Sequence, residues 1–350
     1  MEAYPIIVLH KGSSDYLKIC LAQAKFSNPN SRIILLGDET NETLAKQVGA
    51  EHYLICNYFS KALEFEKIYK HYSTNSYNFE LFCFQRWFVV DEFINSEGLD
   101  KFLHIDSDVL LYADFSKELE FIDFIKNYDL THPYASAHTS FFNNKSALCE
   151  FCNFIFEIFS DNSFFTQFEN NPNDDKIYFK QGGFELELDK PLSDMTLVYF
   201  FTKLNRVRCL DTNKADFKNC CINGNFLSNS MLCSSFGNIC YTVFDNCNIP
   251  YFIDTRDSVP KLLKMYSIHF QGWKKGLMSK YCTFDKKEQI KQINYSNEDL
   301  ERIFSIKINK PKPQKRSLGR ILSNIIEIFV PSRKLRTKIR EKLVGYTPYY

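Results

Sequence analysis

The sequence predicts an α/β fold, in which a mostly parallel sheet is flanked by helices and is followed by a small β-rich C-terminal part and a basic helical tail. Short apolar runs at residues 6–9, 32–36, 52–55 and 101–105 alternate with segments of helical periodicity. This alternation produces parallel strands joined by right-handed crossovers, with helices on both faces. Ligands bind such sheets beyond the carboxyl ends of the strands, so the residues that follow each run are candidate site residues.

Helices are expected between these strands. The first is indicated by apolar residues at helical spacing, namely Leu17, Cys20, Leu21 and Ala24. A short helix from Glu42 to Val48 ends at Gly49, which suits a C-cap. A longer helix ends at Gly98 and carries Phe79, Phe82, Cys83, Arg86, Trp87, Val90, Phe93 and Ile94. Beyond Leu204, short segments rich in Asn, Cys and Ser predict a small β region that folds back on the sheet.

The charge is divided unevenly along the chain. The formal net charge is +1, with 43 basic and 42 acidic residues, but the segment from Lys310 onward contains 11 basic and 2 acidic residues. The body is therefore acidic, which argues against a nucleic-acid-binding protein. Pro311 and Pro313 favour an extended linker. We expect a catalytic domain over residues 1–309 and a basic amphipathic helical tail over residues 310–350.

Composition indicates a folded protein of the cytoplasm. With 45% hydrophobic residues, 34 Phe and 20 Tyr, the chain has ample core material. The N-terminus lacks a basic segment followed by a long apolar one, so we expect no signal peptide, and no apolar run has the length of a membrane span. The 12 cysteines are then expected to be reduced thiols, and the Cys149–Cys152 pair to be structural because no second ligand pair accompanies it.

Two carboxylates stand where an apolar strand ends. Asp106 and Asp108 follow the run Phe102 to Ile105 and precede the apolar Val109 to Leu111. Side chains at i and i+2 of an extended chain point the same way, so both carboxylates can face one small space. Carboxylates this close repel one another unless a cation lies between them, and oxygen ligands suit Mg²⁺ or Mn²⁺. An ion at this position would stabilise a diphosphate leaving group.

A second cluster of candidate residues lies far along the chain, at residues 269–275. His269 is a candidate third metal ligand, Gly272 permits close approach of the backbone to a phosphate, and Lys275 supplies a positive charge for it. Together with Asp106 and Asp108 these residues would complete a metal and diphosphate site.

The chain resembles bacterial nucleotide-diphospho-sugar glycosyltransferases of the GT-A (Rossmann-like) fold, similar in style to glycosyltransferase families 8 and 32. The resemblance runs over roughly residues 4–280 and rests on residues 82–88, 106–108, 139–144, 193–197 and 269–275. The Asp-x-Asp motif and the His-x-x-Gly-x-x-Lys spacing are its specific parts. Gly276 and Leu277 replace the Pro-Trp that usually follows the lysine in family 8, so Lys274 is an alternative to Lys275 as the phosphate ligand.

The resemblance implies a role for each candidate residue. The metal, Mn²⁺ or Mg²⁺, is expected on Asp106, Asp108 and His269. The nucleotide-diphosphate sugar, with a UDP-sugar favoured, is expected on His10, Lys11, Gly12, Asp38, Ser107, Gly272 and Lys275. The catalytic candidates are Arg86, Asn143 and Asn144, near which the donor sugar is expected, and Asp194, which is expected to bind acceptor or sugar hydroxyls or to act as base. The acceptor is expected to be a glycan or a lipid-linked sugar in bacterial surface polysaccharide synthesis.

Other classes remain open at this stage. A haloacid-dehalogenase-type phosphatase also places Asp-x-Asp after a strand, but Asp174 and Asp175 lack the apolar strand that its second acidic pair requires. A non-catalytic protein that binds sugar nucleotides or a membrane surface is a second alternative. A sugar-phosphate nucleotidyltransferase is disfavoured because its Gly-rich, Arg-containing N-terminal loop is missing.

The tail predicts contact with an anionic membrane. One apolar stripe comprises Leu318, Ile321, Leu322, Ile325, Ile326 and Phe329, and a second comprises Leu335, Ile339 and Leu343 among six basic residues. A helix of this kind suits an anionic bilayer surface, with each cation contributing roughly 1 kcal/mol before screening. We expect a cytoplasmic enzyme held peripherally at the inner face of the membrane, although docking of the tail on the body or on a second copy is also consistent with this pattern.

Overall fold

A computed structural model describes residues 3–133, 136–170, 176–181, 184–189, 192–212, 220–225, 242–244, 250–254 and 261–285. The chain divides into two units, residues 1–289 and 290–350, and every described residue belongs to the first. The predicted basic tail and its boundary at residue 310 lie outside the described residues.

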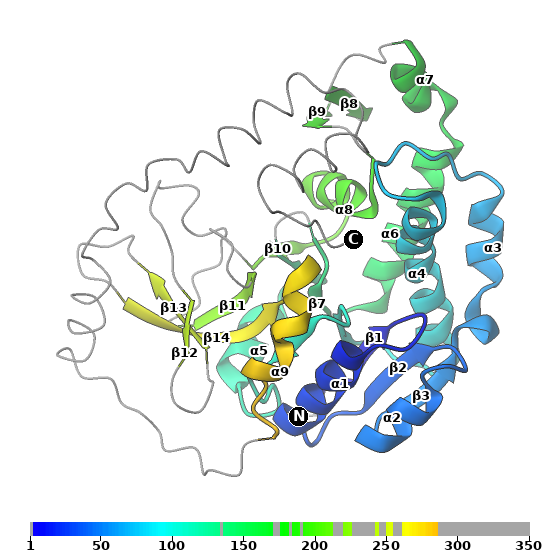
Figure 1. Ribbon diagram of the computed structural model, residues 1–350. Helices are drawn as coiled ribbons and strands as arrows, with labels where there is room; N and C mark the ends of the chain where they lie inside the picture. Colours follow the sequence, from blue (N-terminus) through cyan, green and yellow to red (C-terminus); the bar gives the residue numbers. More distant parts are fainter. Residues whose placement is uncertain are drawn as a thin grey trace, which may run out of the picture. The chain divides into compact units, whose positions relative to one another are not determined.

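The central sheet has seven strands in the order β10-β6-β7-β4-β1-β2-β3 (Figure 1). The strands are, in chain order, β1 (Ile6–Leu9), β2 (Ile33–Gly37), β3 (Glu51–Leu54), β4 (Phe102–Ile105), β6 (Leu130–His132), β7 (Thr139–Phe142) and β10 (Cys209–Asp211). All neighbouring strands run parallel except β7, which is antiparallel to both β4 and β6. The predicted α/β class with a mostly parallel sheet is confirmed.

Helices cover both faces of this sheet. The helices of the described residues are α1 (Asp15–Ser27), α2 (Glu42–Val48), α3 (Ser60–Glu66), α4 (Tyr77–Ser96), α5 (Leu119–Ile125), α6 (Lys145–Ser160), α7 (Asn162–Asn170), α8 (Asp194–Lys203) and α9 (Met278–Tyr281), with 3-10 turns η1 (Ile55–Tyr58) and η2 (Gly272–Leu277). Of these, α7 lies beside the β8–β9 hairpin (Figure 1). No helix in the described part of the chain is both long and apolar enough to cross a membrane.

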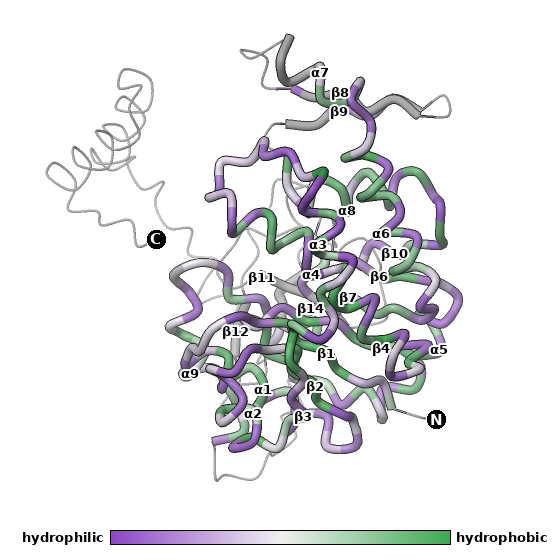
Figure 2. Tube along the Cα trace, turned by 90° about the vertical axis from the view of Figure 1, so that its right-hand side faces the viewer, coloured by the Kyte–Doolittle hydropathy of each residue, from purple (hydrophilic) through white to green (hydrophobic). Residues whose placement is uncertain are grey.

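Alternation along the strands divides the core into two layers. In β1, Ile7 belongs to one buried cluster, with α3, α4, α6 and α8, while Ile6 and Val8 belong to the other, with α1, α5 and α9. Buried apolar strands of this kind are usual in parallel sheets covered on both faces. Figure 2 shows the hydrophobic segments gathered along β1 and β4, with hydrophilic segments toward the periphery.

The predicted C-terminal β region is a second sheet. Its strands are β11 (Cys220–Asn225), β12 (Thr242–Phe244), β13 (Pro250–Asp254) and β14 (Lys261–His269), and β14 also pairs with β5 (Val109–Leu111). That pairing is antiparallel and sets His269 opposite Val109. Residues about 160 positions apart in sequence therefore meet just after the Asp-x-Asp turn. A separate hairpin joins β8 (Lys176–Gln181) to β9 (Phe184–Asp189).

Candidate functional site

Asp106 lies directly beyond the carboxyl end of β4 and is held from two sides. Arg86 of α4 donates Nη1 to its Oδ1 at 2.8 Å, and His104 Nε2 lies 3.5 Å from the same oxygen. The Asp106 amide donates to the carbonyl of His138 at 2.8 Å. Burial alone would raise the pKa of Asp106, but the Arg86 charge and His104 outweigh burial and hold it well below its usual value. The group is therefore a fixed anion.

Asp108 is the more deeply buried carboxylate, with 8% of its side chain exposed. Its Oδ1 lies 3.2 Å from His269 Nε2, and its Oδ2 lies 3.1 Å from Lys275 Nζ. The Phe270 amide donates to its backbone carbonyl at 2.8 Å, which ties the end of β14 to the Asp-x-Asp turn. Burial would raise the pKa of Asp108, but the hydrogen bond and charge of His269 lower it. Two segments distant in sequence thus form one charged cluster.

The three predicted metal ligands come together. One ligand atom from each of Asp106, Asp108 and His269 lies within 4.8 Å of the other two. Opposite ligands of an octahedral Mg²⁺ are about 4.2 Å apart, so small side-chain shifts would bring all three onto one ion. Two carboxylates and an imidazole also form a ligand set that Mn²⁺ accepts. The residues present fit a divalent cation.

The side of the cluster where the sequence predicts the diphosphate is formed by η2 and α1. Gly272 has φ +65°, a conformation that favours glycine, and it begins the turn that carries Lys275. The Lys275 ammonium lies 4.9 Å from the centroid of the Tyr16 ring as well as beside Asp108. Burial would lower the pKa of Lys275, but the Asp108 carboxylate raises it, so the side chain stays charged. A cation thus borders the candidate metal ligands.

The loop after β1 joins this cluster through Ser107. The ring nitrogen Nδ1 of His10 lies 2.9 Å from Ser107 Oγ. Gly12, with φ +88°, donates its amide to Asp38 Oδ2 at 2.6 Å. The pKa of Asp38 would be raised by burial, but hydrogen bonds from Thr40 and Gly12 lower it. The ends of β1, β2 and β4 therefore form one polar edge of the sheet, as the topology predicts.

Lys11 stands at the rim of this edge, with its ammonium 5.9 Å from the centroid of the Phe82 ring. All seven residues expected to bind the nucleotide sugar thus lie on the loop after β1, at the end of β2, in the Asp-x-Asp turn or on η2.

Arg86 links Asp106 to Asp194. Its Nη2 donates to Asp194 Oδ2 at 2.6 Å, and the Trp87 indole Nε1 donates to the same oxygen at 3.3 Å. Ser193 and Thr196 form a capping box at the start of α8, which places Asp194 in the first turn. The Asp194 carboxylate accordingly holds the guanidinium that holds Asp106.

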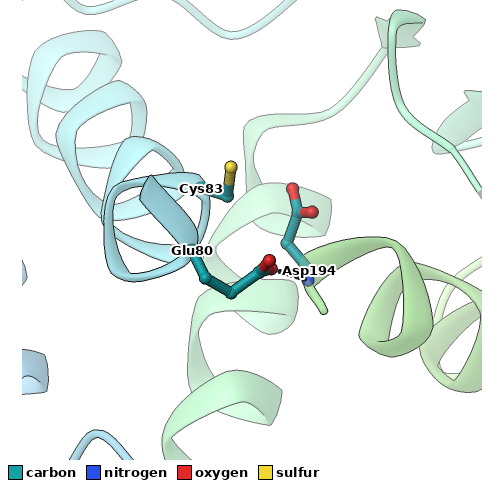
Figure 3. Close-up of side chains that lie close together, drawn as sticks. All are labelled: Glu80, Cys83 and Asp194. Atoms are coloured by element: carbon teal, nitrogen blue, oxygen red, sulfur yellow. Dashed lines mark hydrogen bonds between the residues drawn. The ribbon is translucent and has the colours of Figure 1, made fainter. Parts of the chain in front are cut away.

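A second group of potential ligands surrounds Asp194 but is held differently. Glu80, Cys83 and Asp194 also have ligand atoms within 4.8 Å of one another, and Figure 3 shows Glu80 and Cys83 on α4 turned toward Asp194 on α8. Glu80 is 1% exposed and accepts hydrogen bonds from Ser73, Asn75 and the Asp194 amide. Burial raises the pKa of the Cys83 thiol far above its usual value, so it stays protonated. These contacts indicate that the cluster stabilises the packing of α8 against α4.

Asn143 and Asn144 are not brought to the site. Because β7 runs antiparallel to β4, with Thr139 opposite Ile105 and Phe142 opposite Phe102, both residues lie near the start of β4. Asn143 accepts from the Tyr4 hydroxyl at 2.6 Å, and Asn144 caps α6. The length of β4 places them about 13 Å from the carboxylates. The expectation that they bind the sugar is corrected on this ground.

Several residues beneath the carboxylates were not predicted. His138 stacks on His269 with ring centroids 4.3 Å apart, and burial followed by the His269 charge lowers the pKa of His138 to about 3. Buried nitrogen or oxygen atoms of Arg86, His104, His138 and Ser140 lack a hydrogen-bond partner within the described structure. Buried polar atoms are rarely unpaired, so their gathering under Asp106 marks this layer as part of the site. Arg86 was a candidate from the resemblance, whereas His104, His138 and Ser140 lie within or directly before apolar strands, where a single polar residue carries no signal in the sequence.

Several solved structures are similar to this chain at low sequence identity. No protein-family profile matches the chain, and no curated protein sequence matches it. Mouse xyloside xylosyltransferase 1 is similar with a TM-score of 0.43 at 8% identity, covering 65% of this chain and 88% of that one. An active-site mutant of LgtC has a TM-score of 0.40 at 12% identity, covering 79% and 94%. A cytidylyltransferase from Leptospira borgpetersenii has a TM-score of 0.29 at 11% identity, covering 59% and 94%.

Proposed function

We propose that the protein is a metal-dependent glycosyltransferase of the GT-A type, which moves a sugar from a nucleotide-diphosphate donor to a glycan or glycolipid acceptor. The observation that carries the proposal is the convergence of Asp106, Asp108 and His269 on one space, with Lys275 directly beside it. Two carboxylates, an imidazole and a neighbouring ammonium form the combination that a metal-bound diphosphate requires.

Each part of the site receives a role. Asp106, Asp108 and His269 would hold Mn²⁺ or Mg²⁺, which as a Lewis acid offsets charge on the departing nucleoside diphosphate. Lys275 binds that diphosphate as a point charge, together with the backbone around Gly272. The nucleoside, with uridine favoured, lies along His10, Lys11, Gly12, Asp38 and Ser107.

Arg86 and Asp194 act by positioning. Arg86 bonds to Asp106 at 2.8 Å and to Asp194 at 2.6 Å, so its guanidinium fixes one metal ligand from behind. The Asp194 carboxylate is engaged by Arg86 and Trp87, which favours a role in holding Arg86 over a role as general base.

The function is tested by incubating the purified chain with UDP-, GDP-, CMP- and dTDP-sugars in Mn²⁺ and measuring sugar release. Slow, metal-dependent hydrolysis of one donor is expected, because water replaces a missing acceptor. Release of phosphate from simple monoesters instead would indicate a phosphatase, and neither activity would indicate a binding protein. His269→Ala is the matched variant, and undiminished hydrolysis by it would contradict the site.

The acceptor is proposed to lie on a membrane, in bacterial surface polysaccharide synthesis. This part rests on the two apolar stripes of residues 318–343 and on the basic residues around the second stripe, all of which lie outside the described residues. The full chain is expected to co-sediment with anionic vesicles at low salt and to lose this binding in Arg333→Glu/Lys334→Glu/Arg336→Glu. Absence of binding by the full chain, or equal binding by the variant, would contradict the membrane role.

A further inference from the structure

A polar pocket lies beside the central sheet, at the end of α8 remote from Asp194. Its volume is about 280 Å³, near the lower end of the range of about 300–1,000 Å³ that small-ligand sites occupy. The lining residues are His132, Tyr199, Thr202, Lys203, Asn205, Cys209 and Asp211. None of them takes part in the metal and diphosphate site described above.

Two regular elements and a turn build the pocket. Tyr199, Thr202 and Lys203 follow i, i+3, i+4 spacing and so share one face of α8. Cys209 and Asp211 alternate along β10 and so share one face of that edge strand. Asn205, with φ +52°, lies in the turn between these elements in the left-handed conformation that asparagine tolerates.

Two lining residues of the pocket, His132 and Asp211, lie at the same edge of the sheet as Asp106. His132 ends β6 and Asp211, paired with it, ends β10. Because β6 and β4 are both antiparallel to β7, these ends point the same way as the end of β4. The two strand spacings from β4 to β6 amount to about 10 Å. Along α8, the rise from Asp194 to Thr202 is about 12 Å. Both estimates place the pocket about one or two sugar rings away from the site at Asp106 and Asp194.

The chemistry of the lining suits a polyol. Asn205 carries groups that both donate and accept hydrogen bonds, Asp211 accepts, and Lys203 donates. The Thr202 hydroxyl donates to the Tyr199 carbonyl at 3.0 Å and offers its oxygen as an acceptor. A sugar hydroxyl also donates and accepts, so it matches such a mixture. One lysine and one aspartate leave the lining without a strong net charge, which argues against a phosphate or a polyanion. The Tyr199 ring, 5.3 Å from the Lys203 ammonium, adds an apolar wall.

We propose that this pocket binds a sugar residue of the acceptor, one or two rings away from the hydroxyl that is glycosylated. The inference rests on the proposed glycosyltransferase function and adds to it the class of group recognised and the residues that recognise it. Asp211 and Thr202 bind sugar hydroxyls there, and the acceptor chain runs from this pocket along the sheet edge toward Asp106.

The test is saturation-transfer NMR on the full chain with the methyl glycosides of glucose, galactose and N-acetylglucosamine, in the presence of UDP and Mg²⁺. At least one glycoside is expected to receive saturation from the protein. Because a hydrogen bond to a charged group changes affinity about tenfold and a neutral one about fivefold, Asp211→Asn and Thr202→Val should each weaken binding about fivefold or more. Asp123→Asn, at an exposed carboxylate of α5, is the control and should bind like the wild type.

Two outcomes would overturn the proposal. One is the absence of saturation transfer to all three glycosides from the wild-type chain, and the other is equal binding by Asp211→Asn, Thr202→Val and the control. Calorimetry with UDP and Mg²⁺ on the same samples separates this proposal from the proposed function. Variants that keep their melting temperature and UDP affinity but no longer bind the glycoside would support the assignment of the pocket. A wild-type chain that binds a glycoside but no nucleotide would contradict the proposed donor site and not the pocket.

Discussion

Two clusters of acidic side chains in this protein have the same compactness and opposite surroundings. In each, three potential ligand atoms lie within 4.8 Å of one another. Around Asp106 and Asp108 the partners are Arg86, His269 and Lys275, which are cations or metal ligands. Around Glu80 the partners are neutral donors, and in the same cluster the Asp194 carboxylate is held by Arg86 and Trp87.

The difference shows that compactness alone does not identify a metal site. Charged partners hold carboxylates ionised and leave a charged ligand set that an ion or a diphosphate can join. Neutral donors satisfy a carboxylate completely and fix it in the fold. The first cluster is therefore assigned to ligand binding and the second to stability, and Arg86 connects the two through Asp106 and Asp194.

The largest expected effect comes from Asp108→Asn, which keeps the shape of the side chain and removes its charge. Removing one of three metal ligands should lower the affinity for UDP in Mn²⁺ by about 100-fold or more, since outer-shell changes alone cost 10- to 100-fold. Without metal the two proteins should bind equally. Calorimetry with UDP, in Mn²⁺ or in a chelator, measures the affinity with and without metal. As the control, Glu80→Gln should leave the metal-dependent affinity unchanged. Equal UDP affinities of the wild type and Asp108→Asn in Mn²⁺ would contradict the assignment of Asp108 as a metal ligand.

The next effect concerns the stability of the second cluster. Glu80→Ala leaves the Ser73, Asn75 and Asp194 donors without their carboxylate in a buried place, so it should lower the free energy of unfolding by about 3 kcal/mol. Urea denaturation measures the loss. Glu80→Gln retains one acceptor oxygen and should lose less. A decrease of less than about 0.5 kcal/mol in the free energy of unfolding for Glu80→Ala would show that this cluster contributes little to stability.

The smallest effect separates two neighbouring lysines. Lys275 contacts Asp108 at 3.1 Å, whereas Lys274 has its pKa lowered by burial. Lys275→Ala should weaken UDP binding about tenfold and leave uridine binding unchanged, because an ammonium interacts with the phosphates alone. Competition binding with both ligands provides the comparison. If Lys274→Ala causes that loss and Lys275→Ala does not, the phosphate ligand is the neighbouring residue.

Local patterns in the sequence predicted much of the donor side of the site. The apolar run before Asp106 indicates a strand end, and parallel strands bring their ends to one edge. At that edge His10 contacts Ser107, and Gly12 contacts Asp38. The pairing of β14 with β5, which brings His269 to Asp108, is a contact across the whole domain. A periodic pattern cannot encode such a contact, and only the resemblance of the motif indicated it.

The direction of β7 was the main cause of error. Its apolar residues predict a strand but not an antiparallel one, and the direction decides whether Asn143 lies at the site or at the opposite edge. Glu80 was missed for a similar reason, since an acid in the first turn of a helix is ordinary. Its role becomes visible only when α8 is placed against α4, with the Asp194 amide 3.3 Å from Glu80.

The most direct test of the central claim is electron paramagnetic resonance of Mn²⁺ titrated into the full chain, with and without UDP. We expect one bound Mn²⁺ per chain, and we expect the ion to bind more tightly when UDP is present, because it joins the carboxylates to the diphosphate. Binding should be lost in Asp108→Asn and retained in Glu80→Gln. Binding that persists in Asp108→Asn, or that is lost in Glu80→Gln with the fold intact, would place the ion elsewhere and contradict the account.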